Sequence, residues 1–118
     1  MLTVEIMLSD VKDSLEPGIN IQYTGVTIQI QRENYPSLYL TLDKSNKFWR
    51  ASLDVEDLMN TLAMEYPFQS NLLQIVFSQY AESCNDFQFL SKDSLSVAVK
   101  KAVDTIYEMI ERINYHAD

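Results

Sequence analysis

The stretch that most constrains the fold is residues 94–115, where apolar side chains recur every three or four positions without a break. This spacing places them on one arc of an α-helix, and neither Gly nor Pro interrupts the run. A helix of this length extends about 33 Å, which is enough to cover most of a small sheet. Asp93, or alternatively Ser91, is suited to cap its first turn. The predicted apolar stripe consists of Leu95, Ala98, Val99, Ala102, Val103, Ile106, Met109, Ile110 and Ile113.

The opposite face of this predicted helix is charged. It carries Asp104, Glu108 and Glu111, and the four-residue spacing allows ion pairs from Lys100 to Asp104 and from Glu108 to Arg112. One interpretation is a solvated helix face with internal pairs. The other is an acidic patch that binds Lys or Arg side chains of a partner.

The first half of the chain has the period-two pattern of β-strands. Apolar residues alternate with polar ones, and polar or turn-forming segments separate the runs. In the last run we expect Trp49, Ala51 and Leu53 to point inward and Arg50 outward. We therefore predict an antiparallel meander with strands at residues 2–8, 19–23, 26–30, 38–42 and 48–53, and with turns or loops at 10–18, 34–37 and 43–47.

The apolar positions switch from odd to even across Thr24-Gly25. A two-residue hairpin turn there would pair Tyr23 with Val26 and Ile21 with Ile28, and a bulge near Gly25 is the alternative. The hairpin puts six apolar side chains on one face, namely Ile19, Ile21, Tyr23, Val26, Ile28 and Ile30. The other face is polar and uncharged, with Asn20, Gln22, Thr27, Gln29 and Gln31. It is typical of a solvated sheet face, and it is alternatively a hydrogen-bonding platform for a partner.

The hydrophobic period changes to that of a helix at Asp54. We predict a helix from Val55 that Pro67 ends, with Asp54 as its N-cap. Glu56 and Asp57 fall in the first turn, where negative charge suits the helix dipole. The three acidic residues also allow a carboxylate pair or a Mg²⁺ site, but capping is the simpler interpretation.

Residues 71–83 have helical spacing with an apolar arc that nearly encircles the segment, which predicts a buried helix. Phe87 and Phe89 alternate with polar residues and indicate a short extra strand. The predicted fold class is therefore α+β: an N-terminal antiparallel meander of four to five strands, about three helices packed on one face, and a long C-terminal helix. We expect one domain over residues 1–118.

The residue types that carry catalysis or bind metals are scarce. His116 is the one histidine and Cys84 the one cysteine, so a zinc site or a triad with a well-fixed base is not expected. Gly18 and Gly25 are too far apart to form a phosphate-binding loop. We predict no enzyme activity, no metal and no cofactor.

The chain of 118 residues has 17 acidic and 9 basic residues, giving a net charge of −8. This charge disfavours nucleic acid and anionic membranes as partners and favours a basic protein, although acidity also serves solubility alone. No apolar run is long enough to span a bilayer and no signal peptide is evident, so we expect a cytoplasmic protein.

By elimination, we expect a non-catalytic protein that acts by binding another protein. The leading hypothesis is a small acidic inhibitor, such as a bacterial immunity protein that neutralises a basic nuclease toxin, and it favours a monomer. The alternative is a dimeric acidic secretion or assembly chaperone. The aromatic Tyr39 is considered either a sheet-packing residue or an interface residue. The candidate partner-binding residues are Asp104, Glu108, Glu111, Asp54, Glu56, Asp57, Tyr39 and Gln29.

Overall fold

The computed structural model describes residues 11–45 and 47–117 and has a five-stranded antiparallel sheet with strand order β1-β2-β3-β4-β5. The α+β prediction is confirmed, and the predicted strand at residues 2–8 lies outside the described residues. Residues 11–14, which were expected to be part of a turn or loop, are helical. The elements that follow are β1 (Ile19–Thr24), β2 (Thr27–Arg32), β3 (Leu38–Lys44), β4 (Trp49–Leu53), α2 (Val55–Glu65), α3 (Ser70–Ser83), β5 (Gln88–Ser91) and α4 (Leu95–Ala117).

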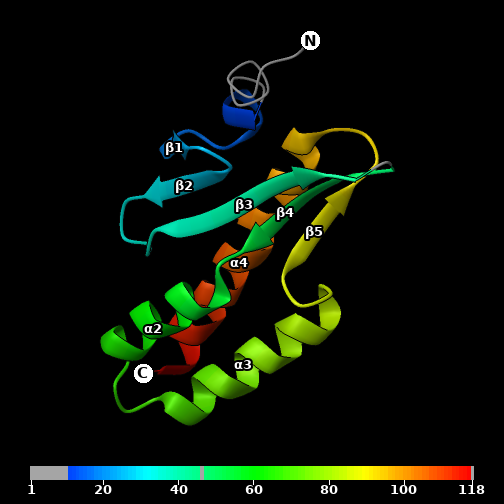
Figure 1. Cartoon of the computed structure of the whole chain (residues 1–118). Coiled ribbons are helices and arrows are strands. Elements are labelled where there is room, and N and C mark those ends of the chain that lie inside the picture. Colours follow the sequence, from blue (N-terminus) through cyan, green and yellow to red (C-terminus); the bar gives the residue numbers. More distant parts are fainter. Residues whose placement is uncertain (1–10, 46, 118) are drawn as a thin grey trace.

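The long helix α4 is the element that covers the sheet. It packs against β4 and β5, α3 packs against α4, and α2 packs against α3. In Figure 1, α4 runs behind the sheet, and α2 and α3 lie below the lower end of the strands. The amide of Gln69, between α2 and α3, donates to the carbonyl of Ala117 at 3.2 Å and so ties this helical end together.

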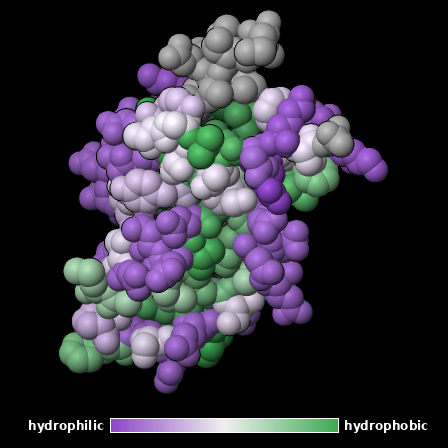
Figure 2. Space-filling model, in the orientation of Figure 1, coloured by the Kyte–Doolittle hydropathy of each residue, from purple (hydrophilic) through white to green (hydrophobic). Residues whose placement is uncertain are grey.

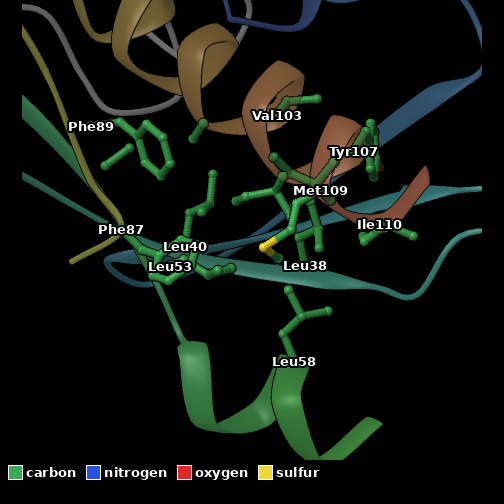
Figure 3. Packing of buried hydrophobic residues seen from close by; sticks show 14 of the residues in the cluster. Leu38, Leu40, Leu53, Leu58, Phe87, Phe89, Val103, Tyr107, Met109 and Ile110 are labelled. Atoms are coloured by element: carbon green, nitrogen blue, oxygen red, sulfur yellow. The ribbon is translucent and has the colours of Figure 1, made fainter. Parts of the chain in front are cut away.

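The core lies between α4 and the sheet. All nine residues of the predicted stripe are buried, so that prediction is confirmed. Figure 3 shows Met109 of α4 extending toward Leu38 of β3, with Leu58 of α2 entering the same core. Side chains from every described strand and helix belong to this single cluster. Because α4 contributes ten buried residues to it, α4 is the central element of the core.

The β1–β2 hairpin is present, but its predicted register is wrong by two residues. Tyr23 pairs with Ile28 and Ile21 with Ile30, so the turn consists of Gly25 and Val26. Gly25 has a φ of +67° at the first turn position, as a type II′ turn requires. A shift of two residues keeps every paired side chain on its face. Val26 alone leaves the predicted apolar face, and it is 65% exposed.

The second correction concerns the loop predicted at residues 43–47. Strand β3 continues to Lys44, because Asp43 pairs with Arg50 and Lys44 with Trp49 across β3 and β4. The guanidinium of Arg50 donates to Asp43, with Nε 3.0 Å from Oδ1. The ammonium of Lys44 lies 4.5 Å from the Trp49 ring centroid. These polar contacts between the strands extend the hairpin beyond its apolar pattern.

The two middle helices follow the prediction with one difference. Asp54 caps α2, since its side chain accepts from the backbone amide of Asp57 at 3.1 Å. In α3 the buried residues lie on one side, and Ile75 is 57% exposed. The expectation that α3 is apolar and buried nearly all round was therefore wrong for the side of Ile75, because α3 packs on α4 with one face only.

An unusual turn connects α3 to β5. Asn85, Asp86 and Phe87 all have φ between +54° and +62°, a conformation that L-residues rarely adopt in succession. Phe87 is 2% exposed, and its ring centroid lies 5.9 Å from that of Phe77. Burial of this ring offsets the backbone strain and starts the short strand that was predicted around Phe87 and Phe89.

Candidate functional site

The three predicted acidic residues of α4 lie together around a surface hollow. Asp104, Glu108 and Glu111 are exposed and fall on one stripe of the helix. The hollow has a volume of about 220 Å³. We call it the acidic hollow, and it is lined by Glu16, Ile19, Arg32, Val103, Asp104, Tyr107, Glu108 and Glu111.

The charge of this lining is strongly negative. Four carboxylates face one guanidinium, that of Arg32, whose Nη2 lies 4.0 Å from Oε2 of Glu16. The predicted pair of Lys100 and Asp104 is confirmed, with Nζ 3.1 Å from Oδ2. Both pairs are partly exposed and contribute only a fraction of a kcal/mol each, so the carboxylates remain available to a stronger cation.

Glu111 is oriented by a contact across the molecule. The hydroxyl of Tyr35, which follows β2, donates to Oε1 of Glu111 at 2.6 Å. This hydrogen bond is the largest cause of the raised pKa of Tyr35, and burial adds to it. The contact joins the β2–β3 connection to α4 at one side of the acidic hollow.

Glu108 has a different environment from the one we predicted. Among the described residues, no ion pair joins it to Arg112, whose guanidinium instead lies 5.7 Å from the ring centroid of Tyr80. The pKa of the Tyr80 hydroxyl is raised, first by burial and then by the nearby charge of Glu108. Glu108 therefore lines the acidic hollow with no cation of the described chain bound to it.

Tyr107, the aromatic residue of the lining, contacts the ring of Tyr35 behind it. The rings of Tyr35 and Tyr107 have centroids 4.6 Å apart. The Arg32 guanidinium lies 4.8 Å from the first centroid and 5.4 Å from the second. The chain's own Arg32 thus occupies the cation–π position beside these two rings.

Tyr107 is the most unusual residue of the lining. Its side chain is 5% exposed, and its buried hydroxyl has no hydrogen-bond partner in the described part of the chain. Burial is the main cause that raises the pKa of Tyr107 to about 12, while the charge of Arg32 acts in the opposite direction. An unpaired buried hydroxyl costs stability, so Tyr107 is a local weak point of the core.

Two of the other predicted residues, Gln29 and Tyr39, lie together on the far side of the sheet. Gln29 and Tyr39 are directly opposite each other, and the Gln29 amide donates to the Tyr39 hydroxyl at 3.1 Å. The backbone amide of Asp54 donates to the Tyr39 carbonyl at 2.9 Å. Strand alternation places Gln29 and Tyr39 on the face opposite the buried Ile28 and Leu40, away from α4.

This outer face of the sheet is largely polar, and its charged residues Asp43 and Arg50 bind each other. The register aligns one row across all five strands, made of Thr24, Thr27, Thr41, Ser52 and Gln88. Its side chains pair mainly with one another, as in Gln29 and Tyr39. The eight predicted residues therefore do not share one surface.

The acidic residues at the start of α2 serve the helix itself. Asp54 is the cap, and Glu56 and Asp57 stand in the first turn. The structure shows no group of three His, Cys, Asp or Glu side chains suited to a metal ion among residues 11–45 and 47–117. The capping interpretation of Asp54 is confirmed.

Sequence reasoning missed the aromatic and basic residues of the acidic hollow. Arg32 and Tyr107 were not candidates, because the contact between them joins positions far apart in the chain. The sequence did contain one signal for Tyr107. It lies four residues after Val103, at the border of the apolar stripe, where a tyrosine can bury its ring and keep its hydroxyl near the surface.

Two further surfaces carry exposed apolar side chains. A cavity of about 180 Å³ lies at the β1–β2 turn, lined in part by Tyr23, Val26 and Trp49. Figure 2 shows hydrophobic atoms among hydrophilic ones over the lower, helical end of the molecule. The largest exposed apolar residues of the helices and their connection are Met64, Phe68, Ile75 and Tyr115.

No helix in the described part of the chain is long and apolar enough to cross a membrane. Comparisons of the chain with protein-family models, with curated proteins and with solved structures find no match.

Proposed function

We propose that the protein is a non-catalytic inhibitor that binds a basic protein partner through the acidic hollow. The observation that carries this proposal is the convergence of four carboxylates on one hollow, from α4 and from Glu16 before β1. A surface of this kind is complementary to Lys and Arg side chains. Three of these carboxylates belonged to the candidate set from the sequence, and the hollow adds the concave shape that a flat acidic helix face lacks.

The partner we favour is a nuclease toxin domain of bacterial type, with a basic cleft for nucleic acid. In such a complex the carboxylates of Asp104, Glu108 and Glu111 occupy the places of substrate phosphates. The net charge of −8 accelerates the encounter with a basic cleft over distances of about one Debye length, roughly 8 Å at physiological salt. Blocking the basic cleft of a nuclease toxin in this way is the task of a cytoplasmic bacterial immunity protein.

The test is association with basic proteins encoded beside this gene, measured at several salt concentrations. We expect the on-rate to fall steeply as salt rises, and to fall further in a variant with Asp104, Glu108 and Glu111 changed to Lys. The matched control has the same change of net charge at Glu65, Glu82 and Asp93, which are exposed and lie outside the acidic hollow.

Two results contradict the proposal. If no basic partner binds, or if binding is indifferent to salt, electrostatic inhibition is wrong. If the control variant slows association as much as the α4 variant, the partner responds to total charge or to another surface.

A second candidate function has one specific observation in its favour. Phe68 is 94% exposed, Met64 84% and Tyr115 81%, which is unusual for large apolar side chains at one end of a domain. Such side chains suit a dimeric chaperone that holds an apolar client. Sedimentation of the chain alone separates the two functions, since the chaperone requires a stable dimer that Phe68→Ser weakens and the inhibitor predicts a monomer.

A further inference from the structure

We infer that the outer edge of β1 binds an extended segment of the partner as an added strand of the sheet. This inference rests on the proposed function, and it names the part of the partner that is bound and its chemistry. The segment carries a basic side chain level with Ile19 and an apolar side chain level with Tyr23. Three observations carry it: the outward-facing backbone groups of β1, its uncharged sequence, and the different hollows at its two ends.

The backbone of β1 offers hydrogen-bonding groups on its outer side. Thr24 and Thr27 flank the two-residue turn, and in such a turn the flanking residues are joined by backbone hydrogen bonds. Because bonded and non-bonded pairs alternate in an antiparallel ladder, Ile21 and Tyr23 direct their N–H and C=O groups away from β2. No backbone group of the described residues binds them there. An extended peptide can therefore pair with this edge by main-chain hydrogen bonds.

The two edges of the described sheet differ in how they are protected. Figure 1 shows β1 and β5 at opposite borders of the sheet. Strand β5 has four residues, and the Lys101 ammonium donates to its Leu90 carbonyl at 3.0 Å. Strand β1 has six residues, none of them charged and none of them proline. Exposed edges are usually protected by charges, by proline or by shortness, so β1 has the properties of an edge that pairs with another chain.

The side of β1 that faces the core is only partly covered. Helix α4 packs on β4 and β5, at the other border of the sheet. Ile19 is 6% exposed, Ile21 is half-buried and Tyr23 is 39% exposed. Strand alternation puts all three on one face, where every second side chain of an added strand would contact them. Apolar side chains of that strand therefore gain burial on this face.

Two hollows of different character lie at the ends of this face. Ile19 lines the acidic hollow. Tyr23 lines the cavity of about 180 Å³ at the β1–β2 turn, together with the apolar side chains of Val26, Leu42 and Trp49. The two ends are about 14 Å apart along an extended strand, which is the spacing of side chains four residues apart. Charge complementarity therefore favours a segment with Lys or Arg at one position and an apolar residue four positions away.

The experiment titrates two hexapeptides into the full chain while its backbone amide signals are followed by NMR. The peptides are acetyl-Arg-Thr-Val-Thr-Ile-Thr-amide and the reverse sequence, acetyl-Thr-Ile-Thr-Val-Thr-Arg-amide, because an added strand can run in either direction. With one of them we expect saturable shifts at Ile21 and Tyr23 and slower hydrogen exchange of these two amides. Replacing Arg by Glu in that peptide should weaken binding several-fold.

N-methylated peptides separate strand pairing from other contacts without changing the protein. Two peptides with N-methyl groups at alternate residues differ in which side of the strand has lost its donors. We expect binding to be lost with one pattern and retained with the other.

Variants of the chain locate the interaction at β1. Tyr23→Pro removes the outward N–H, and proline is tolerated on the free side of an edge strand, so we expect a folded chain that no longer binds the peptide. Tyr23→Ala keeps the N–H and should retain part of the affinity. The matched control is Tyr115→Ala, which changes an exposed tyrosine outside both hollows and should leave the affinity unchanged.

The inference is overturned if neither peptide shifts the β1 signals, if the Glu peptide binds as well as the Arg peptide, or if both N-methylation patterns bind equally. Binding of the peptide to a folded Tyr23→Pro chain also overturns it, and the N-methylated pair decides the question if that variant does not fold. Protection of the Ile21 and Tyr23 amides in the free chain overturns it as well, because a segment outside the described residues or a second copy then covers the edge.

These failures are distinct from failure of the proposed function. A basic partner whose association depends on salt and on the α4 carboxylates can still bind when no strand is added to β1.

Discussion

The substitution Tyr107→Phe makes the protein more stable, if the buried hydroxyl is as isolated as the structure shows. The side chain is 5% exposed and the hydroxyl has no partner in the described part of the chain. Burying an unsatisfied polar group costs about 1–3 kcal/mol, and phenylalanine fills nearly the same space. We expect the free energy of unfolding at pH 7 to rise by about 1 kcal/mol, measured by urea denaturation.

The same variant has a second signature at high pH. Burial raises the pKa of Tyr107 to about 12, above its ordinary value of 10.0. Between these two values the unfolded chain releases the phenol proton while the folded chain retains it, so the stability of the unchanged protein falls as pH rises. One pKa unit corresponds to about 1.36 kcal/mol, so the loss approaches about 2.7 kcal/mol above pH 12.

Phenylalanine cannot ionise, so Tyr107→Phe lacks this loss. The difference in unfolding free energy between the two proteins should grow as pH increases from 9 to 11. Tyr115→Phe, at a ring that is 81% exposed, is the matched control. A variant that is less stable at pH 7, or a difference that does not change with pH, would refute the reasoning. The first result means that the hydroxyl has a partner after all, and the second that it titrates normally.

Three further substitutions test the fold by denaturation. Gly25→Ala should cost about 1–2 kcal/mol because Gly25 has a φ of +67°, whereas Val26→Ala at the exposed neighbouring position should be nearly neutral. Asp54→Ala removes the cap of α2 and should cost about 1 kcal/mol, and Asp54→Asn should retain most of it. Ile106→Ala opens a cavity at a fully buried position of α4 and should cost about 2–5 kcal/mol; a cost below 1 kcal/mol would show that α4 is not the centre of the core.

The helices and the fold class follow from local sequence patterns. The stripe of α4 is regular enough that all nine predicted residues are buried, and Asp54 marks the start of α2 by its capping chemistry. Periodicity reports which face of an element is apolar, and that information is local. Periodicity therefore predicts helices and strands better than it predicts which other elements they pack against.

The errors arise where a choice depends on backbone geometry or on the neighbouring element. A turn at Thr24-Gly25 and one at Gly25-Val26 preserve the same faces for the strands, so only the backbone preference of Gly25 separates them. Likewise, Ile75 is apolar but exposed, because α3 has a neighbour on one side only. Of the three successive left-handed residues before β5, Asn85 and Asp86 are of types that tolerate this conformation, but nothing local in the sequence indicates it for Phe87.

The acidic hollow was half predictable. The spacing of Asp104, Glu108 and Glu111 puts them on one stripe, which the sequence shows. Their assembly with Arg32 depends on how the β1–β2 hairpin packs beside α4, and that follows from the tertiary fold.

The composition of the acidic hollow has a consequence for synthesis of the chain. One side comes from Glu16 to Arg32, which the ribosome makes early, and the other from Val103 to Glu111, which it makes late. Neighbouring strands from β1 to β4 are adjacent in sequence and can pair as they emerge, but no hollow exists until α4 has joined them. A nascent chain therefore cannot engage a ligand at this place before its last helix has left the ribosome, and a ligand that binds there holds the early and late parts of the chain together.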